Sequence, residues 1–177
     1  RKDMRTGSER DVNPWPDNPM GHSAEDLKYR FQWTFPIVLS PHDPKTLYVG
    51  ANVLFKSTNE GQTFTAISPD LTRHDPSTLG ASGGPITKDQ TSVEYYATIF
   101  SVAESPVTRG LIWTGSDDGK IFVTRNGGTS WNDVSPEDWG DWLRISSIEP
   151  SHTKPGTAYV AANRYQLDDK RPYLFRT

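Results

Sequence analysis

Two adjacent carboxylic acids, Asp117 and Asp118, stand in the segment Gly115-Ser116-Asp117-Asp118-Gly119. Hydrolysis of a glycosidic bond usually uses two carboxyl groups about 5–10 Å apart, one of which donates a proton to the leaving oxygen. Within this pair, Asp117 is the candidate catalytic residue. An Asp-Asp-Gly run also serves as an ordinary hairpin connection, and this alternative stays open.

Aromatic and arginine side chains recur in the segments that look least like regular strands. Sugar rings stack their C–H faces on flat aromatic rings, while their hydroxyl groups bond to polar side chains. The same aromatic residues could instead be required for packing. The candidate ligand-binding residues are Arg30, Trp33, Tyr95, Tyr96, Arg164 and Tyr165.

The composition argues against several other kinds of site. The absence of Cys excludes disulfides, thiolate metal sites and a cysteine nucleophile. The 4 His residues show no metal-ligand spacing, so we expect neither a metal nor another cofactor. The formal net charge is −3 and no basic stripe is present, so nucleic acid is not an expected partner. No apolar run approaches the roughly 18 residues of a membrane span.

The content of Gly and Pro favours short strands joined by turns. The chain has 177 residues, of which 14 are Gly and 14 are Pro, which is unfavourable for long helices. It also contains three copies of one arrangement of apolar segments and turns. The copies occupy residues 37–41, 47–50 and 54–64, then 101–106, 112–115 and 122–131, and then 145–150, 158–161 and 174–177.

Each copy predicts four short antiparallel strands, which is typical of the blades of a β-propeller. A β-sandwich is the alternative that strand spacing alone would allow. We expect an all-β propeller segment with an incomplete ring of about three blades. Its parts are a top-face segment 1–33, blade A 34–71, an inserted top-face loop 72–95, blade B 96–138, and a truncated blade C 139–177.

A turn motif, Ser/Thr-x-Asn-x-Gly-x-Thr/Ser-Phe/Trp, occurs at 57–64 and again at 124–131. The Asn side chain can accept backbone N–H groups and fix the turn, Gly can supply a positive φ, and the aromatic ring can bury against a neighbouring blade. We therefore interpret these positions as structural. They are Ser57, Asn59, Gly61 and Phe64 in the first copy, and Thr124, Asn126, Gly128 and Trp131 in the second.

This motif resembles the Asp-box, or bacterial neuraminidase repeat, of a large group of β-propellers. Within that group the sequence is similar to bacterial proteins labelled glycosyl hydrolases that carry a sortilin (VPS10) N-terminal-type domain. The supporting stretches are 28–33, 83–87 (Gly-Gly-Pro-Ile-Thr) and 163–169. Both motifs depart from the family in having Asn where it has Asp. The resemblance implies that the motif lies on the rim, away from the active face.

Strand direction alternates within a blade, so every second connection emerges at the same end. By this rule the segments 15–33, 70–96 and 164–173 all leave the blades on one face, which we call the top face. Loops grafted on one end of a rigid scaffold commonly carry function, although long loops can also merely cover the blade ends. We expect the six candidate ligand-binding residues to surround one depression there.

The sequence begins with neither an initiator Met nor an apolar signal segment. We expect this chain to be a piece of a longer protein. Blades A and C should then meet the remaining blades of the same polypeptide or other copies of it. The family resemblance implies a protein that is secreted, periplasmic or on the cell surface.

Two classes of function stay open. The first is a recognition module that binds a glycan or a polypeptide at its top face, as the sortilin-type resemblance implies. The second is a polysaccharide-cleaving hydrolase. Xyloglucanase-like propellers have a catalytic Thr-Asp-x-Gly-Gly pattern, which residues 116–119 match only loosely and which Lys120 breaks. The second carboxylate of such an enzyme would lie outside this chain.

A sialidase is a weaker alternative. It needs three arginines on the carboxylate of the sugar and a Tyr–Glu pair. Glu94 and Tyr95 are adjacent, but the Arg-Ile-Pro signature of that family is absent. The arginines to consider are Arg30, Arg144, Arg164 and Arg171.

Overall fold

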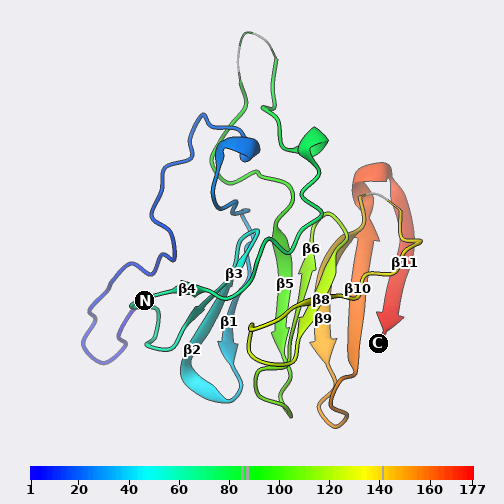
Figure 1. Cartoon of the computed structure of the whole chain (residues 1–177). Helices are drawn as coiled ribbons and strands as arrows, with labels where there is room; N and C mark the ends of the chain where they lie inside the picture. Colours follow the sequence, from blue (N-terminus) through cyan, green and yellow to red (C-terminus); the bar gives the residue numbers. More distant parts are fainter. Residues whose placement is uncertain (85, 87, 141) are drawn as a thin grey trace.

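The computed structural model describes residues 1–84, 86, 88–140 and 142–177. Over these residues the chain forms three antiparallel sheets and three short 3-10 turns, and no α-helix (Figure 1). Pro85 and Thr87 of the Gly-Gly-Pro-Ile-Thr stretch lie outside the described residues. No helix in the described part of the chain is long and apolar enough to cross a membrane.

In each sheet the strands follow one another in chain order. The first sheet, in blade A, contains β1 (Ile37–Ser40), β2 (Asp43–Gly50), β3 (Leu54–Ser57) and β4 (Thr65–Ala66). The second, in blade B, contains β5 (Ile99–Glu104), β6 (Ile112–Ser116), β7 (Ile121–Thr124) and β8 (Asn132–Asp133). The third, in blade C, contains β9 (Arg144–Pro150), β10 (Ala158–Arg164) and β11 (Asp169–Arg176). The 3-10 turns are η1 (Ala24–Asp26), η2 (Pro76–Thr78) and η3 (Tyr165–Leu167).

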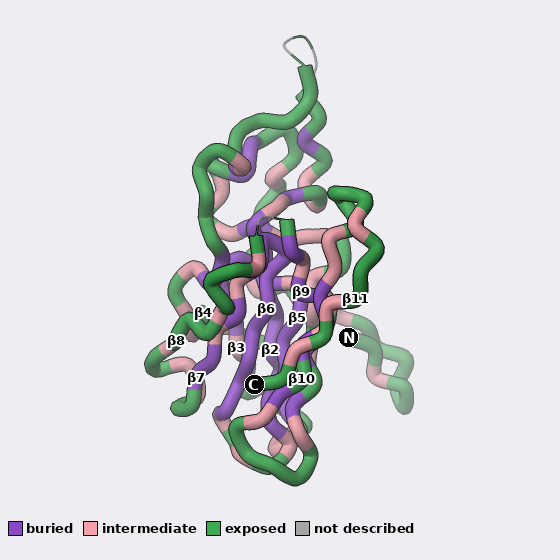
Figure 2. Tube along the Cα trace, turned by 90° about the vertical axis from the view of Figure 1, so that its right-hand side faces the viewer, coloured by how far each residue is buried: buried purple, intermediate pink, exposed green. Residues whose placement is uncertain are grey.

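The sheets pack face to face, so the core lies between neighbouring blades and not inside any one of them. Alternation along each strand sends one set of side chains to each neighbour. Tyr48 and Leu54 of blade A pack with Ile99 and Ile112 of blade B. Figure 2 shows that burial is concentrated in the inner strands, whereas the connections are exposed.

A second interface joins blades B and C. Trp113 and Val123 pack there against Ile145 and Val160. At Gly115 the two sheets approach so closely that a Cβ atom would lie 2.3 Å from Cγ2 of Ile145. Only glycine allows this approach without moving a strand.

The face of blade A that points away from blade B is partly covered by the N-terminal segment. Val12, Phe31 and Phe35 pack there against the cluster around Val49. On β1, the first strand of this sheet, Ile37 is 62% exposed and Leu39 is 63% exposed. Both residues line a groove together with Val12 and Pro14. An apolar strip therefore runs along this face without full cover from the described residues.

The first copy of the turn motif is held by its own side chains. Ser57 Oγ accepts the N–H of Gly61 at 2.8 Å and donates to Asn59 Oδ1 at 2.9 Å. The same Asn59 oxygen accepts the N–H groups of Gln62 and Thr63 at 3.1 and 3.0 Å. Gly61 has a φ of 77°, in the left-handed region that favours glycine.

The second copy repeats these contacts. Thr124 Oγ1 accepts the N–H of Gly128 at 3.0 Å and donates to Asn126 Oδ1 at 2.9 Å. Asn126 Oδ1 accepts the N–H of Ser130 at 2.9 Å, and Gly128 has a φ of 103°. The prediction that the two motifs form equivalent turns is confirmed.

The aromatic residue of the second motif reaches the neighbouring blade, as predicted. The indole N–H of Trp131 donates to the carbonyl of Ile67, in blade A, at 2.9 Å. Phe64, its counterpart in the first motif, packs on the face of blade A that Val12 covers. The N-terminal segment thus occupies part of the position that a preceding blade would take.

Candidate ligand-binding site

The long connections meet at one end of the sheets, as strand alternation predicts. Figure 1 shows the segments 15–33 and 70–96 and the turn η3 at the end where β6 and β10 finish and β5 and β9 begin. The first two segments pack together, because Leu79, Tyr95 and Ala97 form a buried cluster with Ala24. The segment 164–173 is mostly strand, and only η3 within it projects beyond the sheet.

A cavity of about 320 Å³ opens on this top face, between the inserted loop and blades B and C. One side is an aromatic stack, in which the rings of Tyr96 and Trp142 lie 4.7 Å apart between centroids and 27° from parallel. Trp142 is 37% exposed. The lining residues are Arg73, Asp75, Ser77, Thr78, Tyr96, Asp118 and Trp142.

Asp118, one of the polar lining residues, connects blade B to the inserted loop through hydrogen bonds. Its Oδ2 accepts the backbone N–H of Arg73 at 2.9 Å, and its Oδ1 accepts the hydroxyl of Ser116. Burial raises the pKa of the Asp118 carboxyl, and these hydrogen bonds oppose the shift. The cavity therefore combines a flat aromatic surface with hydroxyl groups, a guanidinium and a buried carboxyl group.

Asp117, the candidate catalytic residue, is turned inward. Its Oδ1 accepts the N–H of Thr98 at 2.8 Å, its Oδ2 accepts the Thr98 hydroxyl at 2.9 Å, and the residue is only 5% exposed. Burial raises the pKa of Asp117 to about 7. In blade A the corresponding Asn52 accepts the N–H of Arg30 at 3.0 Å. In both blades this side chain forms hydrogen bonds to the segment that leads into the first strand. Asp117 therefore has a structural role.

Arg30 and Tyr95 are also buried, contrary to the expectation that they line a depression. Arg30 is 1% exposed and lies 2.8 Å from the carboxylate of Asp70, while its Nε donates to the carbonyl of Ala97 at 3.1 Å. The Tyr95 hydroxyl lies 2.9 Å from the carbonyl of His22. Buried polar groups require hydrogen-bond partners. Residues in or next to the segments 15–33 and 70–96 provide them here.

The other candidates are divided over the top face. Tyr96 lines the cavity. Trp33 is exposed, and its indole N–H donates to Glu94 at 3.3 Å, outside the cavity. Tyr165 is exposed and lies against Arg144, whereas Arg164 lies 3.9 Å from the carboxylate of Asp169. The six residues therefore do not surround a single depression.

The structure does not assemble the sialidase arrangement. Arg30 is buried against Asp70, and Arg171 forms an ion pair of 2.7 Å with Asp169. Sequence reasoning did not single out Arg73, chose Asp117 and not Asp118 from the adjacent pair, and did not include Trp142 among the six candidate ligand-binding residues. All three residues lie in or beside the non-repeating segments. That position could have marked them as candidates, but it does not indicate which side chains face the cavity.

Comparisons with solved structures concern the fold. The structure is similar to the GH74 xyloglucanase from Xanthomonas campestris, with 16% sequence identity, a TM-score of 0.50, and coverage of 79% of this chain and 20% of that chain. A GH74 enzyme from Niastella koreensis is similar at 19% identity, a TM-score of 0.49, and coverage of 81% of this chain and 21% of that chain. This chain thus spans about a fifth of the length of those proteins.

No family model matches the sequence, and no curated protein matches it. The sheets and the likeness to the Xanthomonas enzyme confirm the predicted fold class, an all-β segment of a β-propeller with an open ring.

Proposed function

We propose that this chain is part of an Asp-box propeller, with a sortilin-type resemblance, that acts outside the cytoplasm as a recognition module for a glycan. The observation that carries the proposal is the cavity that is lined both by the stacked pair Tyr96 and Trp142 and by Ser77 and Thr78. Aromatic faces bind the C–H faces of sugars, and hydroxyl groups bind their polar edges.

The burial and the hydrogen bonds of the two carboxyl groups favour recognition over hydrolysis. Asp117 is held by Thr98, and Asp118 by Ser116 and the backbone of Arg73. A general acid must reach the glycosidic oxygen, and Asp117 is 5% exposed. A polypeptide ligand is the other outcome that a binding experiment can reveal.

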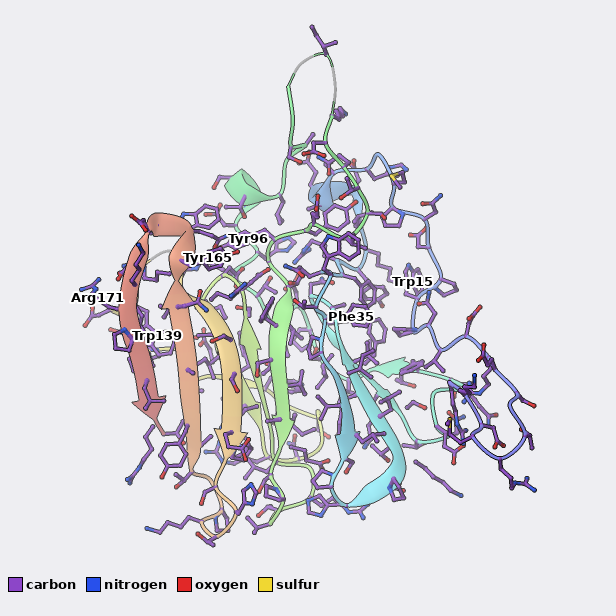
Figure 3. The ribbon with its side chains drawn as sticks, turned by 180° about the vertical axis from the view of Figure 1, so that it is seen from behind. Trp15, Phe35, Tyr96, Trp139, Tyr165 and Arg171 are labelled. Atoms are coloured by element: carbon purple, nitrogen blue, oxygen red, sulfur yellow. The ribbon has the colours of Figure 1, made fainter. Side chains whose placement is uncertain are left out.

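Replacing Trp142 by Ala should weaken glycan binding about fivefold or more, because a stacked aromatic contact contributes about 1 kcal/mol. The measurement is a glycan array that includes xyloglucan and cello-oligosaccharides, followed by titration calorimetry on the binders. Trp15→Ala is the matched control, since Trp15 is also 37% exposed and contacts another ring, that of Tyr29. Figure 3 shows Trp15 on the opposite side of the molecule from Tyr96.

If no glycan binds, or if binding is unchanged in Trp142→Ala and Tyr96→Ala, the proposal is wrong. Binding of peptides alone, lost in the same variants, would assign the cavity to a polypeptide.

We also propose that the exposed strip formed by Ile37 and Leu39 is covered by a further blade of the same polypeptide or by another copy of the chain. Exposed apolar sheet surfaces of this kind promote association. The chain produced by itself should therefore self-associate in light scattering. Ile37→Glu combined with Leu39→Glu should reduce association, and Val107→Glu, at another exposed apolar residue, should not. A monodisperse monomer of the unmodified chain would contradict this.

A further inference from the structure

The side chain of Arg144, the first residue of β9, lies between two aromatic rings. Its guanidinium carbon is 4.6 Å from the ring centroids of both Phe100 and Tyr165. Within the described part of the chain this guanidinium makes no hydrogen bond and no ion pair. Its Nε is buried without a partner, and the two terminal nitrogens reach solvent. Packing thus fixes a positive charge in place, and the described residues provide no counter-charge for it.

A second unpaired group lies on the neighbouring strand. Asn163 is the register partner of Arg144, and its Oδ1 is also buried without a hydrogen bond. Buried polar atoms are nearly always paired, so two orphaned atoms at facing positions indicate that a water or a ligand completes the site.

In blade B the polar groups at the corresponding positions are paired with each other. Register along β9–β10 and β5–β6 places Arg144 and Asn163 where blade B has Thr98 and Asp117. Those two residues satisfy each other with two hydrogen bonds of 2.8 and 2.9 Å. Blade C therefore differs from blade B at a position where the fold itself needs only a small polar anchor.

The geometry selects the ligand chemistry. The guanidinium packs against two rings and its Nε is buried, so a ligand reaches it through the two terminal nitrogens, where a carboxylate forms two parallel charge-assisted hydrogen bonds. Tyr165 is 58% exposed and offers a stacking surface beside that edge. Figure 3 shows Tyr165 at the same end of the sheets as Tyr96, and Trp142 precedes Arg144 by two residues.

We propose that Arg144, with Asn163 and Tyr165, forms a subsite for the carboxylate of an acidic sugar, so that the glycan bound at the top face contains uronate units. The terminal nitrogens of Arg144 pair with the carboxylate, and Asn163 Oδ1 accepts a hydrogen bond from a water that bridges to the sugar. This inference rests on the proposed function, because it places the subsite beside the cavity that contains Tyr96 and Trp142.

The test uses tetragalacturonate and its methyl ester, which has nearly the same shape and no charge, in titration calorimetry at low salt. The protein should bind the acid at least tenfold more tightly than the ester. Arg144→Gln should abolish that preference by weakening binding of the acid, and Arg144→Lys should keep part of the preference. Arg125→Gln is the control, because Arg125 is an exposed arginine in the second turn motif.

Near-ultraviolet circular dichroism establishes that each variant is folded. Equal affinity for acid and ester, or an acid preference that survives Arg144→Gln, overturns this inference. If neutral oligosaccharides still bind and depend on Trp142, the proposed function stands without it. If neither galacturonate nor any neutral oligosaccharide binds, both fail.

Discussion

Replacing Arg30 by Met should lower the free energy of unfolding by about 3 kcal/mol or more, because it breaks a buried ion pair. Arg30 Nη2 lies 2.8 Å from Asp70 Oδ2 and 3.2 Å from the hydroxyl of Thr72, and its Nε donates to the carbonyl of Ala97. The change leaves a carboxylate and a carbonyl oxygen without these donors. Urea unfolding of the protein measures the loss.

The matched control is Arg171→Met. Arg171 forms an ion pair of similar length with Asp169, 2.7 Å, but its side chain is 73% exposed. Exposed ion pairs contribute about 0–1 kcal/mol, so this variant should be nearly as stable as the unmodified protein. Equal losses in the two variants would contradict the structural role of Arg30. Loss of glycan binding in a fully stable Arg30→Met protein would return Arg30 to the ligand-binding set.

Replacing Asp117 by Asn should reduce, by about 2 kcal/mol, the loss of stability that the protein shows between pH 5 and pH 8. Burial raises the pKa of Asp117 from 3.8 to about 7. The folded state therefore binds more protons than the unfolded state between these values, and stability falls as the pH rises through that window. One such group contributes a slope of up to about 1.4 kcal/mol per pH unit.

Asn can keep both contacts of Asp117, since its oxygen accepts the N–H of Thr98 and its amide can donate to the Thr98 hydroxyl. Asn52 already occupies the corresponding position in blade A and accepts a backbone N–H there. We therefore expect Asp117→Asn to be more stable than the unmodified protein at pH 8 by about 2 kcal/mol, and similar to it at pH 5. Urea unfolding at the two pH values measures this.

Asp133→Asn is the control, because hydrogen bonds to Lys120 and Ser135 lower the pKa of Asp133. That carboxyl is ionised throughout the window, so its removal should leave the pH dependence unchanged. An unaltered slope in Asp117→Asn would show that Asp117 does not take up a proton on folding. A folded Asp117→Asn protein that binds a polysaccharide but no longer cleaves it would identify Asp117 as catalytic instead.

The part of this protein that sequence alone determines is the part controlled by near neighbours. The motifs at 57–64 and 124–131 close on their own side chains within four residues, so their equivalence could be predicted without knowing the fold. Alternation along the strands and the repeat of the motif then predicted successive sheets of a propeller. Because strand direction alternates, the end at which the long segments gather could be predicted as well.

The orientation of individual side chains in those segments was decided only by the tertiary structure. Nothing local distinguishes Arg30, which is buried against Asp70, from Arg144, which lies between Phe100 and Tyr165 with its edge accessible. The same is true of Tyr95 and Tyr96, which are adjacent but point to a buried cluster and to the cavity, respectively. Burial of a loop residue depends on contacts with segments distant in sequence, and a charged or aromatic side chain gives no sign of which partners it will meet until those segments pack.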